Sequence, residues 1–288
     1  MAVNAKTLEK PFLTLRKSLK KASGQPSPKE VHDLRTRARR VEAALHALLL
    51  DQRRKGRKIL KEITPVRKRA GKARDMDVLI RLVSSLDVPS DDDCRLRLIG
   101  YLSRRRFAGA RKLHSVIRKR RNSAANHLRR CSRAIRRNHS NKKEQQQWAA
   151  DAAAISLQLS EEIRNWPKLT TKNLHQFRLK VKSCATFWSF QAIRTLVKAL
   201  GNVKNKIGDW HNWVELSAVA RDTLSHRESC AVLKQIRSRT QKYLREGIAE
   251  ANRMRMRYFH PRPTRTNPSA RAIPTSESVW KAAAKLAA

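Results

Sequence analysis

Two segments of the chain carry the same arrangement of side chains that can bind an anion. Residues 31–45 read VHDLRTRARRVEAAL, and residues 174–188 read LHQFRLKVKSCATFW. Guanidinium and ammonium groups bind phosphate oxygens, and an imidazole donates one hydrogen bond when neutral and two when charged. The anion-binding residues correspond in pairs, each pair 143 positions apart: His32 with His175, Arg35 with Arg178, and Arg39 with Lys182. This constant spacing indicates an internal repeat.

Wound as helices at about 100° per residue, both segments separate a charged face from an apolar face. The apolar faces hold Leu34, Ala38, Val41 and Leu45 in the first segment, and Phe177, Val181, Cys184 and Trp188 in the second. A single helical histidine beside arginines is often structurally idle, but its recurrence in register with two cations favours a binding role. If the halves pack about a pseudo-twofold axis, the two charged faces can form a cationic trough.

A second pair of matching segments follows, with one segment in each half. Residues 70–83 read AGKARDMDVLIRLV, and residues 207–220 read IGDWHNWVELSAVA. The corresponding residues are 137 positions apart: Gly71 with Gly208, Arg74 with His211, and Asp75 with Asn212. A glycine followed by Asp or Asn before an apolar run predicts a helix break and an N-cap. Asp75 and Asp77 could instead hold Mg²⁺ beside phosphates, although capping is favoured.

Composition points to a polyanionic partner. The 288 residues include 66 Lys plus Arg against 23 Asp plus Glu, which gives a formal charge of +43. DNA, RNA, an anionic membrane surface and an inorganic polymer all fit this charge. From Cys94 to Lys143 there are 18 Lys or Arg and no acidic residue. Ordinary solvated helices mix the two signs, so this run also favours a polyanion site.

The pattern of apolar residues predicts an all-α protein, because these residues recur every three or four positions and Gly and Pro are few. We expect a break near Pro65 or Gly71, and two helices along the apolar stripe from Leu96 to Ile135. Residues 138–143 are expected to form a linker, and residues 257–288 a flexible basic tail. We expect helices at about 5–22, 28–51 and 53–86, then the two helices of that stripe and one that ends at Trp166. Three more are expected at about 171–200, 202–225 and 227–256.

The sequence predicts a cytoplasmic protein without a cofactor or a bound metal. No run of 18 apolar residues is present, and residues 1–10 lack the apolar stretch of a signal peptide. The four cysteines, at positions 94, 131, 184 and 230, match neither a zinc site nor a disulfide framework. We therefore expect free thiols, with Cys131 and Cys184 packed on apolar helix faces.

Together, VHDLRTRARR with ARDMDVL and LHQFRLKVK with IGDWHNWVEL resemble the CHAD domain, the conserved-histidine α-helical domain, over about residues 1–256. The resemblance implies two four-helix bundles related by pseudo-twofold symmetry, at about 1–143 and 144–256. It also implies one helical domain with a basic central channel that binds inorganic polyphosphate. Ser183 stands where a cation matching Arg40 is expected, and Asn212 where the family usually has Asp. The implied binding residues are His32, Arg35, Arg39, Arg40, Arg74, His175, Arg178, Lys182 and His211.

These features predict a non-catalytic polyphosphate-binding protein that associates with intracellular polyphosphate granules. Acidic residues are few and scattered, and the chain lacks both the E-x-E-x-K signature of the triphosphatase domain that adjoins many relatives and a Walker-type loop. Nonspecific nucleic-acid binding is the alternative. It is secondary because aromatic residues make up only 5% of the chain, with Trp210 as the candidate for an exposed ring. No membrane partner is expected, and the oligomeric state stays open.

Overall fold

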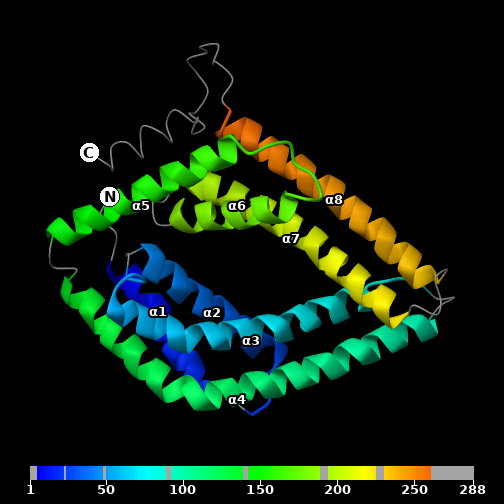
Figure 1. Cartoon of the computed structure of the whole chain (residues 1–288), viewed down its shortest axis with the longest axis horizontal. Helices are drawn as coiled ribbons and strands as arrows, with labels where there is room; N and C mark the ends of the chain where they lie inside the picture. The colour runs from blue at the N-terminus through cyan, green and yellow to red at the C-terminus, as the bar shows by residue number, and fades with distance from the viewer. Residues whose placement is uncertain are drawn as a thin grey trace. The chain divides into compact units, whose positions relative to one another are not determined.

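The computed structural model describes residues 5–22, 24–47, 50–88, 92–138, 142–188, 194–224 and 230–260. Within these ranges the chain forms helices and no strand, which confirms the predicted all-α class (Figure 1). The predicted tail lies outside the described residues from position 261 on. The helices are α1 (Ala5–Lys21), α2 (Pro28–Ala47), α3 (Arg54–Ser84), α4 (Asp92–Asn138), α5 (Lys142–Arg164), α6 (Leu174–Trp188), α7 (Arg194–Thr223) and α8 (Ala231–Tyr258).

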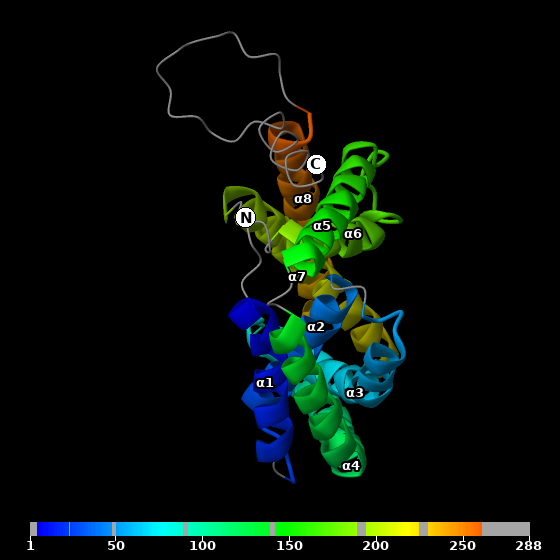
Figure 2. The same ribbon diagram turned by 90° about the vertical axis from the view of Figure 1, so that its left-hand side faces the viewer.

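The chain divides into two compact units. Among the described residues, one unit contains 5–145 with 215–235, and the other contains 146–214 with 236–260. In the first unit α1 and α3 each pack against both α2 and α4, which makes a four-helix bundle (Figures 1 and 2). In the second unit α5, α6, α7 and α8 all contribute to one buried apolar cluster. The pseudo-twofold relation, the central channel and the boundary at 143 stay predictions.

The apolar faces of α2 and α6 are buried as the sequence predicts. All eight residues named for them are at most 2% exposed. Trp188, at the end of α6, donates a hydrogen bond from its indole nitrogen to the Ser160 hydroxyl at 3.3 Å, so its polar atom has a partner inside the core. Trp210 is 5% exposed, and the expectation of an exposed ring there is wrong. Both faces therefore anchor their helices in a core.

The predicted break near Pro65 or Gly71 is wrong, because α3 continues through both residues. Proline has no N–H, so the carbonyl four residues earlier, that of Lys61, loses its usual helical partner. Arg120 of α4 donates to this carbonyl at 3.1 Å and also pairs with Glu62 at 3.3 Å. A neighbouring helix thus replaces the missing hydrogen bond.

Two other predicted boundaries are also wrong. The apolar stripe up to Ile135 belongs to one 47-residue helix, α4, although Leu96 at its start is 57% exposed. The expected boundary between helices at 200 and 202 falls inside α7, where Gly201 is an ordinary helical residue. An isolated glycine costs a helix only about 1 kcal/mol, which the packing of the buried Leu200 and Val203 outweighs.

Candidate functional site

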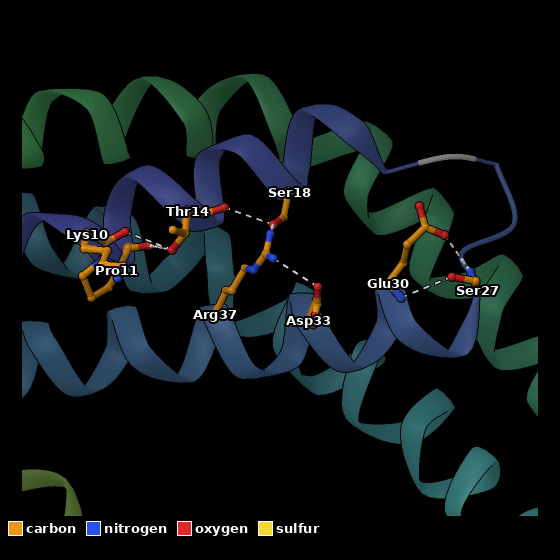
Figure 3. Close-up of polar contacts among 8 residues, drawn as sticks. All are labelled: Lys10, Pro11, Thr14, Ser18, Ser27, Glu30, Asp33 and Arg37. Carbon is orange, nitrogen blue, oxygen red and sulfur yellow. Dashed lines mark hydrogen bonds and ion pairs between the residues drawn. The ribbon is translucent and has the colours of Figure 1, made fainter. Parts of the chain in front are cut away.

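The start of α2 is fixed by a capping box immediately before the first histidine. The Ser27 backbone N–H donates to the Glu30 carboxylate at 2.8 Å, and the Glu30 N–H donates to the Ser27 hydroxyl at 3.2 Å (Figure 3). Further along α2, Arg37 bonds to Ser18 of α1 and to Asp33. Arg37 therefore ties α1 to α2.

Arg35 of α2 lies against Gly71 of α3, the glycine of the second motif in the same half. A Cβ added to Gly71 of α3 would be 3.6 Å from the Arg35 Nε. One guanidinium nitrogen of Arg35 is 3.6 Å from a carboxylate oxygen of Asp75, one turn further along α3. The Arg35 side chain therefore lies against the surface of α3 at Gly71, at an ordinary van der Waals distance. Sequence reasoning missed Asp75 as the partner of Arg35, although its position four residues after Gly71 places both on one helix face.

Arg74 brings a second guanidinium to the same helix surface. Its pKa is lowered, first by partial burial and then by the positive charge of Arg81, with a further contribution from Arg35. Asp75 and Asp77 offset only part of this repulsion. Crowded cations with too few acids are stabilised by an added anion. Arg39 is half-buried on α2, while His32 and Arg40 are exposed. We call this set the first cationic face: His32, Arg35, Arg39, Arg40 and Arg74.

The capping roles predicted for Asp75 and Asn212 are wrong, because both residues lie within continuous helices, α3 and α7. Asp77 is not a cap either. Its nearly buried carboxylate accepts a 3.1 Å hydrogen bond from Arg106 of α4, and Arg106 also donates to the Pro26 carbonyl at 2.9 Å. The DxD pair is thus held by arginines of two different helices. In the described parts of the chain, no three His, Cys, Asp or Glu side chains are grouped closely enough to hold a metal ion.

The second half brings its two predicted histidines into contact. The rings of His175 on α6 and His211 on α7 have centroids 4.3 Å apart and are tilted by 47°. Both residues are half-buried. His211 of α7 therefore contacts the histidine of α6, and it is the residue that the sequence repeat pairs with Arg74 of α3. Two imidazoles in contact present several ring nitrogens to one ligand, and an anion favours their charged forms.

Of the two contacts between a motif arginine and a matched glycine, that of Arg178 with Gly208 is the closer. A Cβ on Gly208 would be only 2.8 Å from one terminal nitrogen of the Arg178 guanidinium, and Arg178 Nε donates to the Lys204 carbonyl at 3.2 Å. Asp209 lies nearby. Partial burial raises the pKa of its carboxyl group, while Lys206 and Arg178 oppose this rise. Sequence reasoning missed Asp209, which the pattern of the first half does not indicate.

The remaining residues show how the halves differ. Lys182 is half-buried on α6, one turn after Arg178, and Asn212 is half-buried beside His211. Ser183 is exposed, and its hydroxyl donates to the Leu179 carbonyl of its own helix at 3.2 Å. It therefore does not replace the cation of the first half. We call this set the second cationic face: His175, Arg178, Lys182 and His211.

A close helix crossing supports each face from behind. A Cβ on Gly109 of α4 would be 3.7 Å from the backbone of Ala73, the neighbour of Arg74. In the second half, a Cβ on Gly247 of α8 would be 3.6 Å from Ile207, the neighbour of Gly208. Close packing of this kind restricts the motion of α3 and α7. The cations are consequently presented on firmly held helices.

Comparisons with known proteins agree with this architecture. Residues 8–221 match the family described as the CHAD domain. The structure is similar to the crystal structure of the CHAD domain from the plant Ricinus communis, with a TM-score of 0.56 and 14% sequence identity, over 87% of this chain and 86% of that one. At this identity the likeness concerns the fold alone. No curated protein matches the sequence.

Proposed function

The chain belongs to the CHAD family, and from that premise we propose that it binds inorganic polyphosphate, without catalysing a reaction, through the first and second cationic faces. One observation supports this proposal most strongly. In each half, the arginine of the His-x-x-Arg motif lies against the matched glycine of the following long helix, as Arg35 does at Gly71 and Arg178 at Gly208. The same local arrangement therefore recurs in two places.

The chemistry of the faces suits a phosphate polymer. Arginine forks can bind two oxygens at once, while lysine acts as a point charge. Polyphosphate repeats anionic oxygens and presents no base edges, so a row of cations suffices to recognise it. The lowered pKa of Arg74 is consistent with this role, since partial burial and neighbouring cations destabilise its charged form and a bound anion would relieve that cost.

The proposal extends to where the protein acts. A chain with a formal charge of +43 would be attracted to the densest polyanion available, and we propose that it associates with polyphosphate granules in the cytoplasm. None of the described helices combines the length and apolar character needed to cross a membrane.

A salt-controlled competition tests the class of ligand. Long-chain polyphosphate labelled at one end is bound to the protein, then displaced by unlabelled polyphosphate, duplex DNA or single-stranded RNA at matched phosphate concentration. We expect polyphosphate to displace the label and both nucleic acids to fail at the same concentration. Equal displacement by all three would mean that the charge acts generically, and would favour the nucleic-acid alternative.

A further inference from the structure

A row of arginines on α4 forms a further cationic surface, outside both the first and the second cationic face. Arg104, Arg111 and Arg118 repeat every seven residues, so each side chain is turned by only about 20° from the previous one and lies about 10.5 Å further along the helix. Arg129 and Arg133 return to the same side, within an arc of about 60°. All five residues are exposed. We call this set the arginine line: Arg104, Arg111, Arg118, Arg129 and Arg133.

The arginine line is distinct from the arginines that hold α4 in the bundle. Arg106 pairs with Asp77, and Arg120 pairs with Glu62, and both acids belong to α3. These two arginines lie about 160° to 200° around the helix from Arg104, on the side that packs against α3. Figure 1 shows α4 running beside α3, so the arginine line is on the side of α4 that points away from α3. A ligand on the line is therefore separated from Arg74 by the thickness of a helix.

The composition of α4 also sets it apart from its counterpart in the second half. No acidic residue occurs between positions 94 and 138. In α8, by contrast, Glu246 pairs with Lys206 at 2.8 Å, and Glu250 pairs with Arg253 at 2.6 Å. The line is thus not a by-product of the repeat. Like-charged side chains along one helix destabilise it, and a bound polyanion removes that repulsion.

The geometry of the line favours a flexible phosphate polymer over nucleic acid. Proteins that bind single strands stack bases on a series of aromatic rings, whereas the exposed aromatic beside the line is Phe107. The positions between the arginines hold the small or polar residues Ala108, Ser115 and Asn122. The phosphates of a duplex wind around its axis, so a row of cations along one side of α4, which bends along its length in Figure 1, meets each strand only where that strand crosses it. A bare polyphosphate chain can follow the row for its whole length, about 44 Å.

We propose that the arginine line is a second polyphosphate site, so that one molecule can hold two phosphate chains and join them. The inference rests on the proposed function, because it assumes that a cationic face holds the first chain. The arginine line points away from α3, which carries Arg74 of the first cationic face, so one short chain is not expected to fill both sites. The protein would consequently crosslink polyphosphate, which a single site cannot do.

A bridging assay tests this inference. Short polyphosphate is fixed to beads and loaded with protein, and fluorescent polyphosphate of the same length is then added. The test variant carries Arg104→Gln, Arg111→Gln, Arg118→Gln and Arg129→Gln. A control variant removes four exposed cations from α8 by Lys234→Gln, Arg237→Gln, Lys242→Gln and Arg245→Gln. Both variants lower the net charge equally.

We expect the line variant to bind the beads as the wild type does but to capture at least about fivefold less fluorescent chain, while the control captures the normal amount. Unchanged capture by the line variant, or an equal loss in the control, would overturn the proposal. Capture of labelled duplex DNA or RNA that only the line variant loses, and that free polyphosphate does not displace, would assign the line to nucleic acid instead. Failure of the proposed function would look different, since the line variant, which has only the cationic faces left, would then not stay on the beads.

Discussion

Replacing Gly208 with alanine should move Arg178 without removing any charge from the protein. The new Cβ would lie 2.8 Å from a terminal nitrogen and 3.2 Å from both Cζ and Nε of the guanidinium. Carbon and nitrogen atoms cannot approach this closely without a bond, so the flexible side chain must shift and lose its 3.2 Å hydrogen bond to the Lys204 carbonyl. Gly71→Ala is the matched control, because its Cβ would meet Arg35 at an ordinary 3.6 Å.

The two substitutions should separate affinity from stability. Alanine stabilises a helix interior by up to about 1 kcal/mol relative to glycine. In Gly208→Ala, loss of the Arg178 hydrogen bond offsets this gain by about the same amount. A displaced charge-assisted contact to phosphate should cost about 1 to 2 kcal/mol of binding, or roughly a 5- to 30-fold weaker affinity. Gly71→Ala should raise the free energy of unfolding and leave the affinity within about twofold.

The assay is fluorescence anisotropy of end-labelled polyphosphate at fixed salt, with urea unfolding measured on the same samples. A double-mutant cycle identifies the cause. In an Arg178→Ala background, Gly208→Ala should have no further effect on affinity, because the side chain that it displaces is already gone. Wild-type affinity in Gly208→Ala, or a full additional loss in the double variant, would refute the placement of Arg178 in the binding face.

Three further predictions follow from particular contacts. Burial raises the pKa of the Cys184 thiol to about 12 and that of Cys131 to about 11, so neither should react with a thiol reagent at pH 8 until the chain is unfolded. Reaction of either thiol in the folded protein would contradict this prediction. An unfolded thiol ionises at about pH 8.5, so between about pH 9 and 12 these two thiols ionise in the unfolded chain before they do so in the folded one, and the free energy of unfolding measured in urea should fall. Glu30→Ala removes one side of the capping box and should cost about 1 kcal/mol, seen as a lower Tm, whereas an unchanged Tm would mean that the box adds nothing. The rings of His175 and His211 are in contact, 4.3 Å between centroids, and imidazole nitrogens can donate hydrogen bonds to phosphate oxygens. His211→Ala should therefore weaken polyphosphate affinity at fixed pH and salt by about 1 kcal/mol, and an unchanged affinity would exclude the histidine pair from the site.

Sequence periodicity was sufficient to place the helices that carry the repeat. The apolar positions of α2 and α6 are buried because a 3.6-residue period leaves one face free to pack, whatever its partner. The alignment of the two halves also agrees with the local contacts. It matches Arg35 with Arg178 and Gly71 with Gly208, and each arginine lies against the glycine of its own half. These features depend on neighbours along one or two helices.

The predictions that failed depend on contacts from more distant parts of the chain. Gly71 and Gly208 suggested helix breaks, but both helices continue because flanking residues such as Ala70 and Ile207 are buried in the cores. Pro65 is tolerated because Arg120, 55 residues later, donates to the orphaned carbonyl. Asp75 was expected to cap a helix, yet it pairs with Arg35 of another helix. Local propensity cannot anticipate a partner supplied by tertiary packing.

Direct binding of polyphosphate to a variant of both faces tests the central claim. The variant carries Arg35→Ala, Arg39→Ala, Arg178→Ala and Lys182→Ala, and the α8 variant that also lacks four exposed cations is the control. At one fixed salt concentration, affinity should fall by at least about 100-fold in the face variant and only a few-fold in the control. The helical circular dichroism signal should stay unchanged in both. A folded face variant that binds polyphosphate as tightly as the control would contradict the proposed site.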